Sequence, residues 1–331
     1  MTPSPLTQAL LASAAILAAS AAHAQERRQI APNFPNKPIR FIVTVTAGGG
    51  LDFVTRTVAA KLSERIASPV LVENISGANG IIAVNTVIGA PPDGHTLLSA
   101  GGSVPINAVF GKFDRDVRTA LAPVAQMATQ GLLFYVPAGS PVNSVKDLVE
   151  EARRNPGKVT YGSTGVGSVA HLATELLNIA AKMQMVHVPY KGASAAIVDL
   201  TAGRLSLLMS AYGVVQPLVK SGKLKMIATT TAQRIPEAPD LPTVAEQGFP
   251  GYEAANTYTL YTGSGVPAAV MQALNREVIA AIADPDVRRA YAKDSSTPAP
   301  PHSVDELKRI LLGEMDRWAG VVKTANITLE N

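Results

Sequence analysis

The sequence has 331 residues, a formal net charge of +4 and no cysteine, and 47% of its residues are hydrophobic. Such a length supports two domains with cores of their own, so the fold needs no disulfide or structural metal. The absence of cysteine excludes thiolate metal sites, a cysteine nucleophile and a lipid-anchored lipoprotein, and the even spread of 29 basic residues predicts no nucleic acid partner.

The N-terminal segment has the features of a secretory signal peptide. Residues 10–22 are almost wholly apolar, and Ala22-His23-Ala24 places small residues at the −3 and −1 positions of a cleavage site. We predict cleavage after Ala24, so that residues 1–24 are removed and the mature protein is exported to the periplasm. An uncleaved anchor is the alternative, although this apolar run is shorter than the roughly 20 residues that span a bilayer.

Strands and helices alternate over the first half of the remaining chain. Apolar residues recur every four positions from Val54 to Ile66, as in a helix that packs on a sheet. The pattern predicts strands over residues 39–45, 69–74 and 95–100, and helices over residues 54–66 and 80–90. This βαβαβ order implies a parallel sheet.

The same alternation restarts after Pro137 and predicts a second α/β unit. We expect strands over residues 158–161, 186–188, 205–209 and 224–230, and helices over residues 145–154, 169–180 and 193–202. The four prolines within residues 234–251 indicate an irregular surface crossing. Three C-terminal helices are expected over residues 268–283, 285–293 and 304–325. The predicted fold class is therefore α/β.

Two glycine-rich turns, residues 47–52 and 163–168, each connect a predicted strand to a predicted helix. A helix N-terminus at the carboxyl end of a parallel strand presents free N–H groups to an anion, and glycine lets the backbone approach it closely. Two such turns across a cleft would suit a ligand with a carboxylate at one or both ends. For either turn alone the alternative is ordinary turn chemistry, in which Asp52 merely caps the first helix.

The same residues match few of the sequence motifs that are typical of enzymes. Residues 165–170 fit the dinucleotide pattern GxGxxA, but the acidic residue expected about 20 positions later is missing. The sequence has no GxSxG elbow, no HExxH zinc motif and no phosphate-binding P-loop. His171 is better interpreted as a packed or site-lining imidazole than as a catalytic base. We therefore expect no catalytic residues, no metal and no cofactor.

An ordered set of motifs resembles the substrate-binding proteins of tripartite tricarboxylate transporters, the Bug-type family. The resemblance covers essentially the whole mature chain, and the set is far more specific than one glycine-rich loop. The motifs are FPNKPIRFIV (34–43), AGGGLD (47–52), VEN (72–74) with GA (77–78), PDGHTLL (92–98), VHVPYKG (186–192), SGKL (221–224), LPTVAEQGFPGYE (241–253) and ADPDV (283–287).

The resemblance implies a two-lobed periplasmic binding protein, a type II-like clamshell in which each lobe is a mostly parallel sheet flanked by helices. One lobe would comprise residues 25–127 plus 253–331 and the other residues 128–252, with the hinge at the crossings near residues 125–129 and 254–261. The expected protein is a monomer without enzymatic activity, which delivers a small carboxylate to the membrane permease subunits of a tripartite tricarboxylate transporter.

The resemblance also implies which residues line the ligand cleft. Asp52 cannot itself bind an anion, so we expect it to cap and orient its loop or to hold a bridging water. The expected ligand-binding residues are Gly48, Gly49, Gly50, Asp52, Ser103, Asn107, Ser163, Thr164, Gly165, Ser168, Tyr190, Ser210 and Tyr258.

Departures from the family pattern bear on the ligand. The approach to the first glycines carries Thr44 and Thr46 where family members often have prolines. An aspartate that is common in the family within residues 209–212 is missing, which disfavours an amino-acid ligand. We therefore expect a dicarboxylate, a tricarboxylate or an aromatic carboxylate, with Tyr212, Tyr258 and Tyr261 supplying aromatic groups or packing in the hinge. The alternative functions are a periplasmic ligand sensor for signalling and a periplasmic hydrolase.

Overall fold

A ten-stranded mixed sheet organises the molecule, in the order β2-β1-β3-β9-β4-β7-β5-β6, with β8 and β10 pairing to β4. The computed structural model describes residues 28–111 and 113–328, so the predicted signal peptide lies outside the described residues. The strands are β1 (Ile39–Val43), β2 (Val70–Asn74), β3 (Thr96–Ala100), β4 (Leu121–Pro137), β5 (Thr160–Ser163), β6 (Val186–Pro189), β7 (Leu207–Ala211), β8 (Leu224–Thr229), β9 (Ala255–Gly263) and β10 (Ser296–Pro298).

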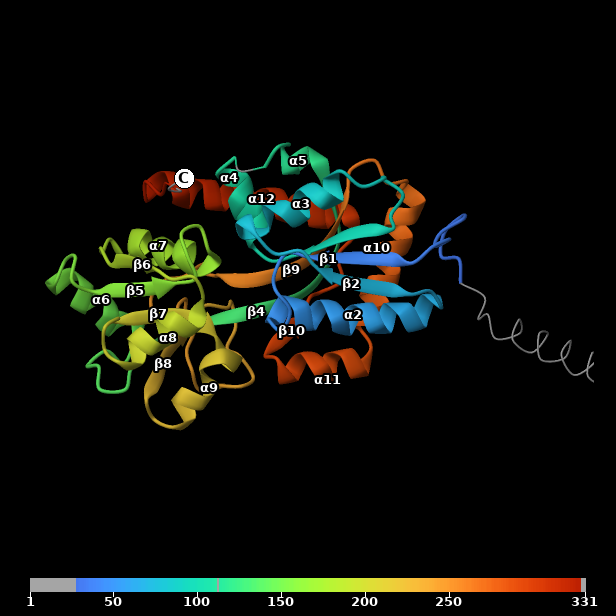
Figure 1. The fold of residues 1–331 in the computed structure, drawn as a ribbon. Coiled ribbons are helices and arrows are strands. Elements are labelled where there is room, and N and C mark those ends of the chain that lie inside the picture. Colours follow the sequence, from blue (N-terminus) through green and yellow to red (C-terminus); the bar gives the residue numbers. More distant parts are fainter. Residues whose placement is uncertain (1–27, 112, 329–331) are drawn as a thin grey trace, which may run out of the picture.

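Helices cover both faces of this sheet along the length of the elongated molecule (Figure 1). Those beside the first strands are α2 (Gly50–Ile66), the short 3₁₀ helix η1 (Ala78–Gly80), α3 (Ile81–Ile88), α4 (Ser103–Val109) and α5 (Val117–Ala120). The second half contributes α6 (Val145–Arg154), α7 (Val169–Ala181), α8 (Ala193–Thr201) and α9 (Tyr212–Lys220). The C-terminal helices are α10 (Ala268–Ile282), α11 (Pro285–Lys293) and α12 (Val304–Thr324).

Each half of the sheet contains three parallel strands, as the alternating pattern predicts. In the first half β1 lies between β2 and β3, and Phe41 is opposite Val72 and Leu97. In the second half β5 lies between β6 and β7. The predicted α/β class is therefore confirmed, and the carboxyl ends of both parallel sets lead into the turns that the sequence singled out.

Two long antiparallel strands, β4 and β9, join the two halves and were not predicted as strands. The hinge crossings expected near residues 125–129 and 254–261 lie on these strands, which pair from Leu121 opposite Gly263 to Gly131 opposite Ala255. The register shifts between Pro123 and Ala125, and again further along β4. Such bulges break the alternation of buried and exposed side chains that identifies a strand in a sequence.

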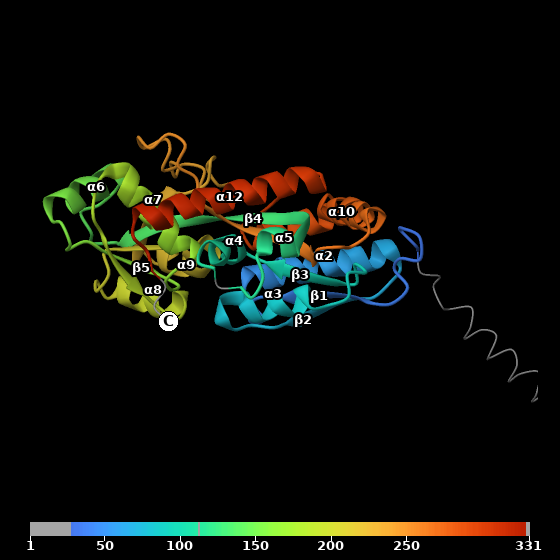
Figure 2. The same cartoon turned by 90° about the horizontal axis from the view of Figure 1, so that it is seen from above.

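Helix α12 packs against both halves of the molecule. Its first turns contribute Leu311 and Met315 to a core cluster of the first half, together with Leu98. Its last turns place Trp318 and Val321 in the main core of the second half. Viewed from above, the helix runs along β4 (Figure 2). Burial of each such side chain stabilises the fold by about 1.5–3 kcal/mol, so α12 ties the two halves together.

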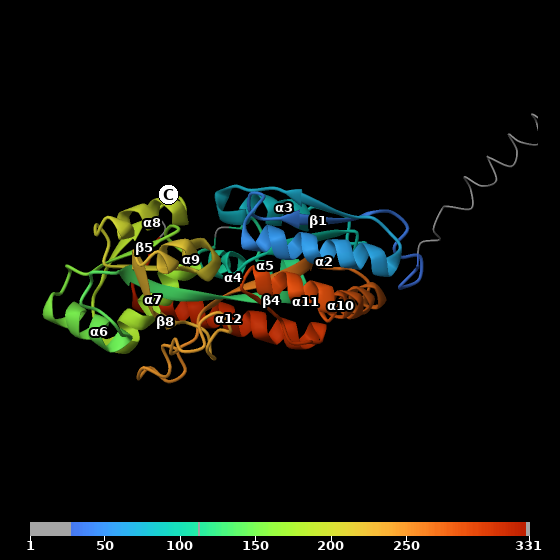
Figure 3. The same cartoon turned by 90° about the horizontal axis from the view of Figure 1, so that it is seen from below.

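The other face of the sheet carries separate helices for each half. Seen from below, α2, α10 and α11 lie on the first half and α8 and α9 lie on the second (Figure 3). Across the whole fold, the sequence predicted most helices within a few residues. It did not predict α4, α5 and α9. In the part of the chain that the structure describes, no helix has both the length and the apolar character that a membrane crossing requires.

Candidate ligand-binding site

A cavity of about 310 Å³ lies between the two glycine-rich turns. The loop after β1 contributes the largest share of its wall: Thr44, Val45, Thr46, Gly49, Gly50 and Leu51. The turn after β3 adds Gly101, Gly102 and Ser103, and β9 adds Asn256 and Tyr258. The second half contributes Thr164, Ser168 and Val169 from the turn and first residue of α7. The two turns predicted to meet across a cleft therefore share one cavity.

The structure divides the predicted ligand-binding residues into two groups. Those in the cavity wall are Gly49, Gly50, Ser103, Thr164, Ser168 and Tyr258. Those outside the wall are Gly48, Asp52, Asn107, Ser163, Gly165, Tyr190 and Ser210. Several members of the second group support the turns through hydrogen bonds.

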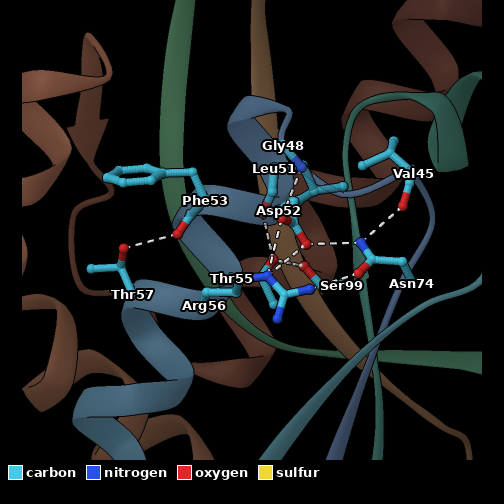
Figure 4. A network of polar contacts seen from close by, with 10 residues as sticks. All are labelled: Val45, Gly48, Leu51, Asp52, Phe53, Thr55, Arg56, Thr57, Asn74 and Ser99. Carbon is cyan, nitrogen blue, oxygen red and sulfur yellow. Dashed lines mark hydrogen bonds and ion pairs between the residues drawn. The ribbon is translucent and has the colours of Figure 1, made fainter.

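The Asp52 side chain fixes the first turn through hydrogen bonds. Its carboxylate accepts hydrogen bonds from the Gly48 N–H at 3.0 Å, from Arg56 Nε at 3.1 Å and from Asn74 Nδ2 at 2.8 Å (Figure 4). Asn74 Nδ2 also donates to the Val45 carbonyl at 3.0 Å. These contacts fit the expectation that Asp52 orients its loop. The expectation that it caps the first helix is wrong, because the N-cap of α2 is Gly49 and no side chain of the described residues caps it.

Electrostatics keep the Asp52 carboxylate charged. The side chain is buried, and burial alone would raise its pKa. The hydrogen bonds from Arg56, Asn74 and Gly48 outweigh that effect and hold the pKa of Asp52 below its usual range. Helix α2 has Gly49 as its N-cap, and no side chain of the described residues caps its first N–H groups, which lie where the helix begins at the cavity.

The second turn is built around the buried Ser163 side chain. Ser163 Oγ accepts the Gly165 N–H at 3.1 Å, lies 3.0 Å from the Gly165 carbonyl and is 2.6 Å from His187 Nε2. Gly165 and Gly167 have φ angles of +124° and +77°, which favour glycine. Ser168 caps α7 by accepting the His171 N–H at 3.2 Å.

Two stacked histidines support this turn from the side away from the cavity. The rings of His171 and His187 lie 3.8 Å apart with an interplanar angle of 8°, and His171 Nδ1 accepts the Gly167 N–H at 3.1 Å. Burial and then the neighbouring His187 lower the pKa of His171 to about 3, and burial lowers the pKa of His187 to about 4. Both imidazoles are therefore neutral at pH 7. His171 was expected to be a packed or site-lining imidazole, and it is buried beside the turn while also lining a separate hollow.

The Ser163–His187 contact has the atoms of a serine hydrolase pair but not its setting. The Ser163 side chain is fully buried and lies outside the cavity wall. His171, Glu175 and His187 help to line a separate hollow of about 440 Å³. Among the described residues, none from the first turn lines that hollow. The serine–histidine contact therefore positions the second turn and does not expose a nucleophile.

Tyr258 closes the cavity from the side of the long strands. Its hydroxyl donates to Gln130 Oε1 at 2.7 Å, and Gln130 Nε2 donates to the Asp294 carbonyl at 3.1 Å. A Cβ added at Gly50 would lie 2.9 Å from the Tyr258 hydroxyl, so only glycine lets the first turn approach this strand so closely. Burial raises the pKa of Tyr258 far above its ordinary value, which keeps the hydroxyl protonated.

The remaining expected residues have other surroundings. The Tyr190 hydroxyl donates to Asp199 at 2.6 Å, Ser210 is buried in β7 opposite Leu133, and Asn107 is buried in α4. The other two tyrosines proposed for the ligand pack in hydrophobic clusters: Tyr212 in the second half and Tyr261 in the first.

The wall residues that were not predicted from the sequence are Thr44, Val45, Thr46, Leu51, Gly101, Gly102, Val169 and Asn256. The two glycines follow a predicted parallel strand, which is the signal that identified the other two turns. A Cβ at Gly102 would lie 2.8 Å from Val169 Cγ2, so the two halves touch here. No sequence signal could identify Asn256, because β9 itself was not recognised.

Among the described residues, the wall offers neutral hydrogen-bonding groups and no charged side chain. It combines hydroxyls from both halves, one side-chain amide and the N-terminal ends of α2 and α7. Neutral donors with the positive ends of two helix dipoles suit an anion. Among residues 28–111 and 113–328, no cluster of three or more histidine, aspartate or glutamate side chains could hold a metal ion.

Comparisons with known proteins agree with this chemistry. Residues 54–327 match the model of the tripartite tricarboxylate transporter family receptors. A relative from a Pseudomonas species, the UPF0065 protein in the tcbD-tcbE intergenic region, is 33% identical over 302 residues, which cover 89% of this chain and 88% of the relative.

Two solved structures that are similar to this chain are of proteins with a carboxylate. R. palustris Rpa4515 with adipate has a TM-score of 0.78 and 33% identity, and the match covers 89% of this chain and 99% of that one. MatC from Rhodopseudomonas palustris with bound malate has a TM-score of 0.74 and 26% identity, with 87% of this chain and 100% of that chain covered.

Proposed function

The chain belongs to the tripartite tricarboxylate transporter receptor family, and we propose that it binds a small carboxylate and delivers it to the membrane permease of such a transporter. The family and its fold are those of substrate-binding receptors and not of enzymes. Its receptors act in the periplasm, and we propose the same compartment for this chain, with a signal peptide cleaved after Ala24 and a monomeric mature form.

The observation that carries the proposal is the shared cavity of the two turns. Helices α2 and α7 come from different halves of the chain and both begin at this cavity. Free N–H groups of α2 and the hydroxyls of Thr164 and Ser168 are donors, and each hydrogen bond to an ionised oxygen contributes about 1.5–3 kcal/mol. A carboxylate that reaches both turns would collect several such bonds.

The proposed ligand is a dicarboxylate, a tricarboxylate or an aromatic carboxylate without an ammonium group. An ammonium group needs an acidic partner, and none of the wall residues is acidic. Asp52 already accepts bonds from Gly48, Arg56 and Asn74, so it is not available to the ligand. The adipate and malate of the two solved relatives are acids without an ammonium group, which supports this class.

Ligand capture would proceed by closure of two lobes, residues 25–127 plus 253–331 and residues 128–252. A ligand that contacts both turns favours the conformation in which the turns are close, because its binding free energy is largest there. The strands β4 and β9 run between the halves and would act as the hinge. The closed form would then be the one that the permease recognises.

The test begins with the protein as purified. Native mass spectrometry should show a bound acid, and thermal unfolding with a panel of carboxylates should show a higher Tm with the right acid. A ligand at 100 times its Kd stabilises the folded state by about 2.7 kcal/mol. Succinate and aspartate form a matched pair that differs by one ammonium group, and succinate should give the larger shift. An unchanged Tm across mono-, di- and tricarboxylates would contradict the proposed function.

A further inference from the structure

One buried hydroxyl in the cavity wall lacks a hydrogen-bond partner. Thr44 is 5% exposed, and its Oγ1 has no hydrogen bond within the described chain. Other buried polar atoms without partners, such as Tyr135 Oη and Trp318 Nε1, belong to residues of hydrophobic core clusters. Thr44 differs from these two because it belongs to the cavity wall.

The surroundings of Thr44 fix its backbone and its methyl group. Its N–H donates to the Ser99 carbonyl at 3.2 Å, which continues the pairing of β1 with β3. A Cβ added at Gly80 would lie 3.3 Å from the Thr44 methyl carbon, so the methyl group packs on that glycine. The fold therefore uses the backbone N–H and the methyl group of Thr44, whereas its hydroxyl has no hydrogen bond in the described chain.

An unpartnered buried hydroxyl is unfavourable, because it loses its bonds to water and gains none in return. Native proteins hydrogen-bond most of their buried polar groups, so an unpaired one in the wall of a cavity needs an explanation. Thr44 follows β1 directly, and its loop continues into Gly49 and Gly50 at the start of α2. The Thr44 hydroxyl is itself enclosed, and among the described residues of this wall it is the one buried side-chain polar atom without a hydrogen bond.

We infer that Thr44 is a specificity-determining residue whose hydroxyl donates a hydrogen bond to an oxygen of the bound acid. The inference rests on the proposed function and deepens it. It assigns the ligand to acids that place a carboxylate, hydroxyl or carbonyl oxygen at the end of β1. An acid of the same size with a methylene group there leaves the hydroxyl unpaired and binds more weakly, as in other sites built around a polar group.

The test uses the isosteric variant Thr44→Val and the acid of the panel that wild type binds most tightly. Removal of one bond to an ionised or polar oxygen should weaken binding about 10- to 100-fold in titration calorimetry. The ligand-free Tm should not fall, because the hydroxyl makes no bond in the folded chain. Thr44→Ser keeps a hydroxyl and should retain affinity within a few-fold of wild type.

Thr55→Val is the matched control with the opposite expectation. Thr55 is also buried, but its hydroxyl donates to the Leu51 carbonyl and contacts Ser99 Oγ, both at 2.6 Å. This variant should lower the ligand-free Tm and change affinity far less than Thr44→Val does. If Thr44→Val binds the acid as tightly as wild type does, the inference about Thr44 is wrong but the proposed function is unaffected. If wild type itself binds no acid, the proposed function is contradicted.

Discussion

The two glycine-rich turns face one cavity but are supported by different chemistry. Behind the first turn a charged Asp52 accepts hydrogen bonds from Arg56 and Asn74. Behind the second turn, neutral His171 and His187 stack on each other and hold Gly167 and Ser163. Similar backbone surfaces can thus be fixed by an ionic network or by buried aromatic rings, and the choice sets how each turn responds to pH.

The largest expected effect is an acid sensitivity that belongs to the second turn. Unfolded histidines take up protons below a pKa of about 6.5, whereas His171 and His187 stay neutral in the fold down to about 3 and 4. The unfolded state therefore binds more protons, and stability falls as the pH drops below about 6.5, by up to about 1.4 kcal/mol per pH unit for each histidine. Urea unfolding at pH 7.0 and pH 5.0 measures this loss.

The double variant His171→Asn plus His187→Gln is the control for the pH effect. It removes both titrating groups and keeps polar atoms near Gly167 and Ser163. Its stability should change far less between pH 7.0 and pH 5.0 than that of wild type. The lowered pKa of Asp52 makes the first turn lose stability only below about pH 4. If the unfolding free energy of wild type is the same at pH 7.0 and pH 5.0, the proposed difference in pH response between the two turns is wrong.

The next effect is expected from Asp52→Ala at the first turn. The variant leaves Arg56, Asn74 and the Gly48 N–H without their shared acceptor, and we expect unfolding free energy to fall by about 3 kcal/mol. Ligand affinity should fall as well, because the turn loses its support. Urea unfolding and calorimetry measure the two changes. Asp305→Ala, at an exposed acid in the first turn of α12, should change stability by less than about 0.5 kcal/mol.

Gly50→Ala tests the close approach between the first turn and Tyr258. The added methyl group would lie 2.9 Å from the Tyr258 hydroxyl, so we expect a loss of about 1–2 kcal/mol in stability and weaker ligand binding. Gly50→Ala combined with Tyr258→Phe should recover part of the stability, because the clashing oxygen is gone. Gly320→Ala in α12 has open space at its Cβ and should be neutral or stabilising. Equal losses in both glycine variants would show that the contact is unimportant.

The smallest effects separate two neighbouring residues of the second turn. Ser163→Ala removes the oxygen that joins Gly165 to His187 and should lower stability by about 1–2 kcal/mol. Thr164→Ala removes an exposed hydroxyl of the cavity wall and should weaken ligand binding while stability stays within about 0.5 kcal/mol. Thermal unfolding and calorimetry on both variants test this separation. The reverse pattern would mean that Ser163 contacts the ligand and Thr164 supports the turn.

Local signals in the sequence predicted much of the fold. Helix α6 occupies the residues over which it was expected, and the Asn155-Pro156-Gly157 sequence marks its end. In the structure the Ser144 side chain also caps its start. The long strands β4 and β9 were missed, since bulges and burial on both faces remove the alternating pattern.

Local sequence patterns predicted only those parts of the site that have such a pattern, namely glycines that follow a parallel strand. Glycines after parallel strands identified both turns that line the cavity. The histidine support was not predictable, because strand register places His187 next to Tyr161 and the rings meet only in the folded protein. The role inferred for Thr44 also needed the structure, which alone shows that its hydroxyl has no hydrogen bond to any described residue.

The most direct test is a crystal structure of the protein with the carboxylate that raises its Tm most. The account predicts that the acid lies in the 310 Å³ cavity, with oxygens on the N–H groups at Gly49 and Gly50, on the Thr164 or Ser168 hydroxyl, and on the Thr44 hydroxyl. An acid bound in the hollow beside His171 and Glu175, with the cavity between the turns filled by water, would contradict it.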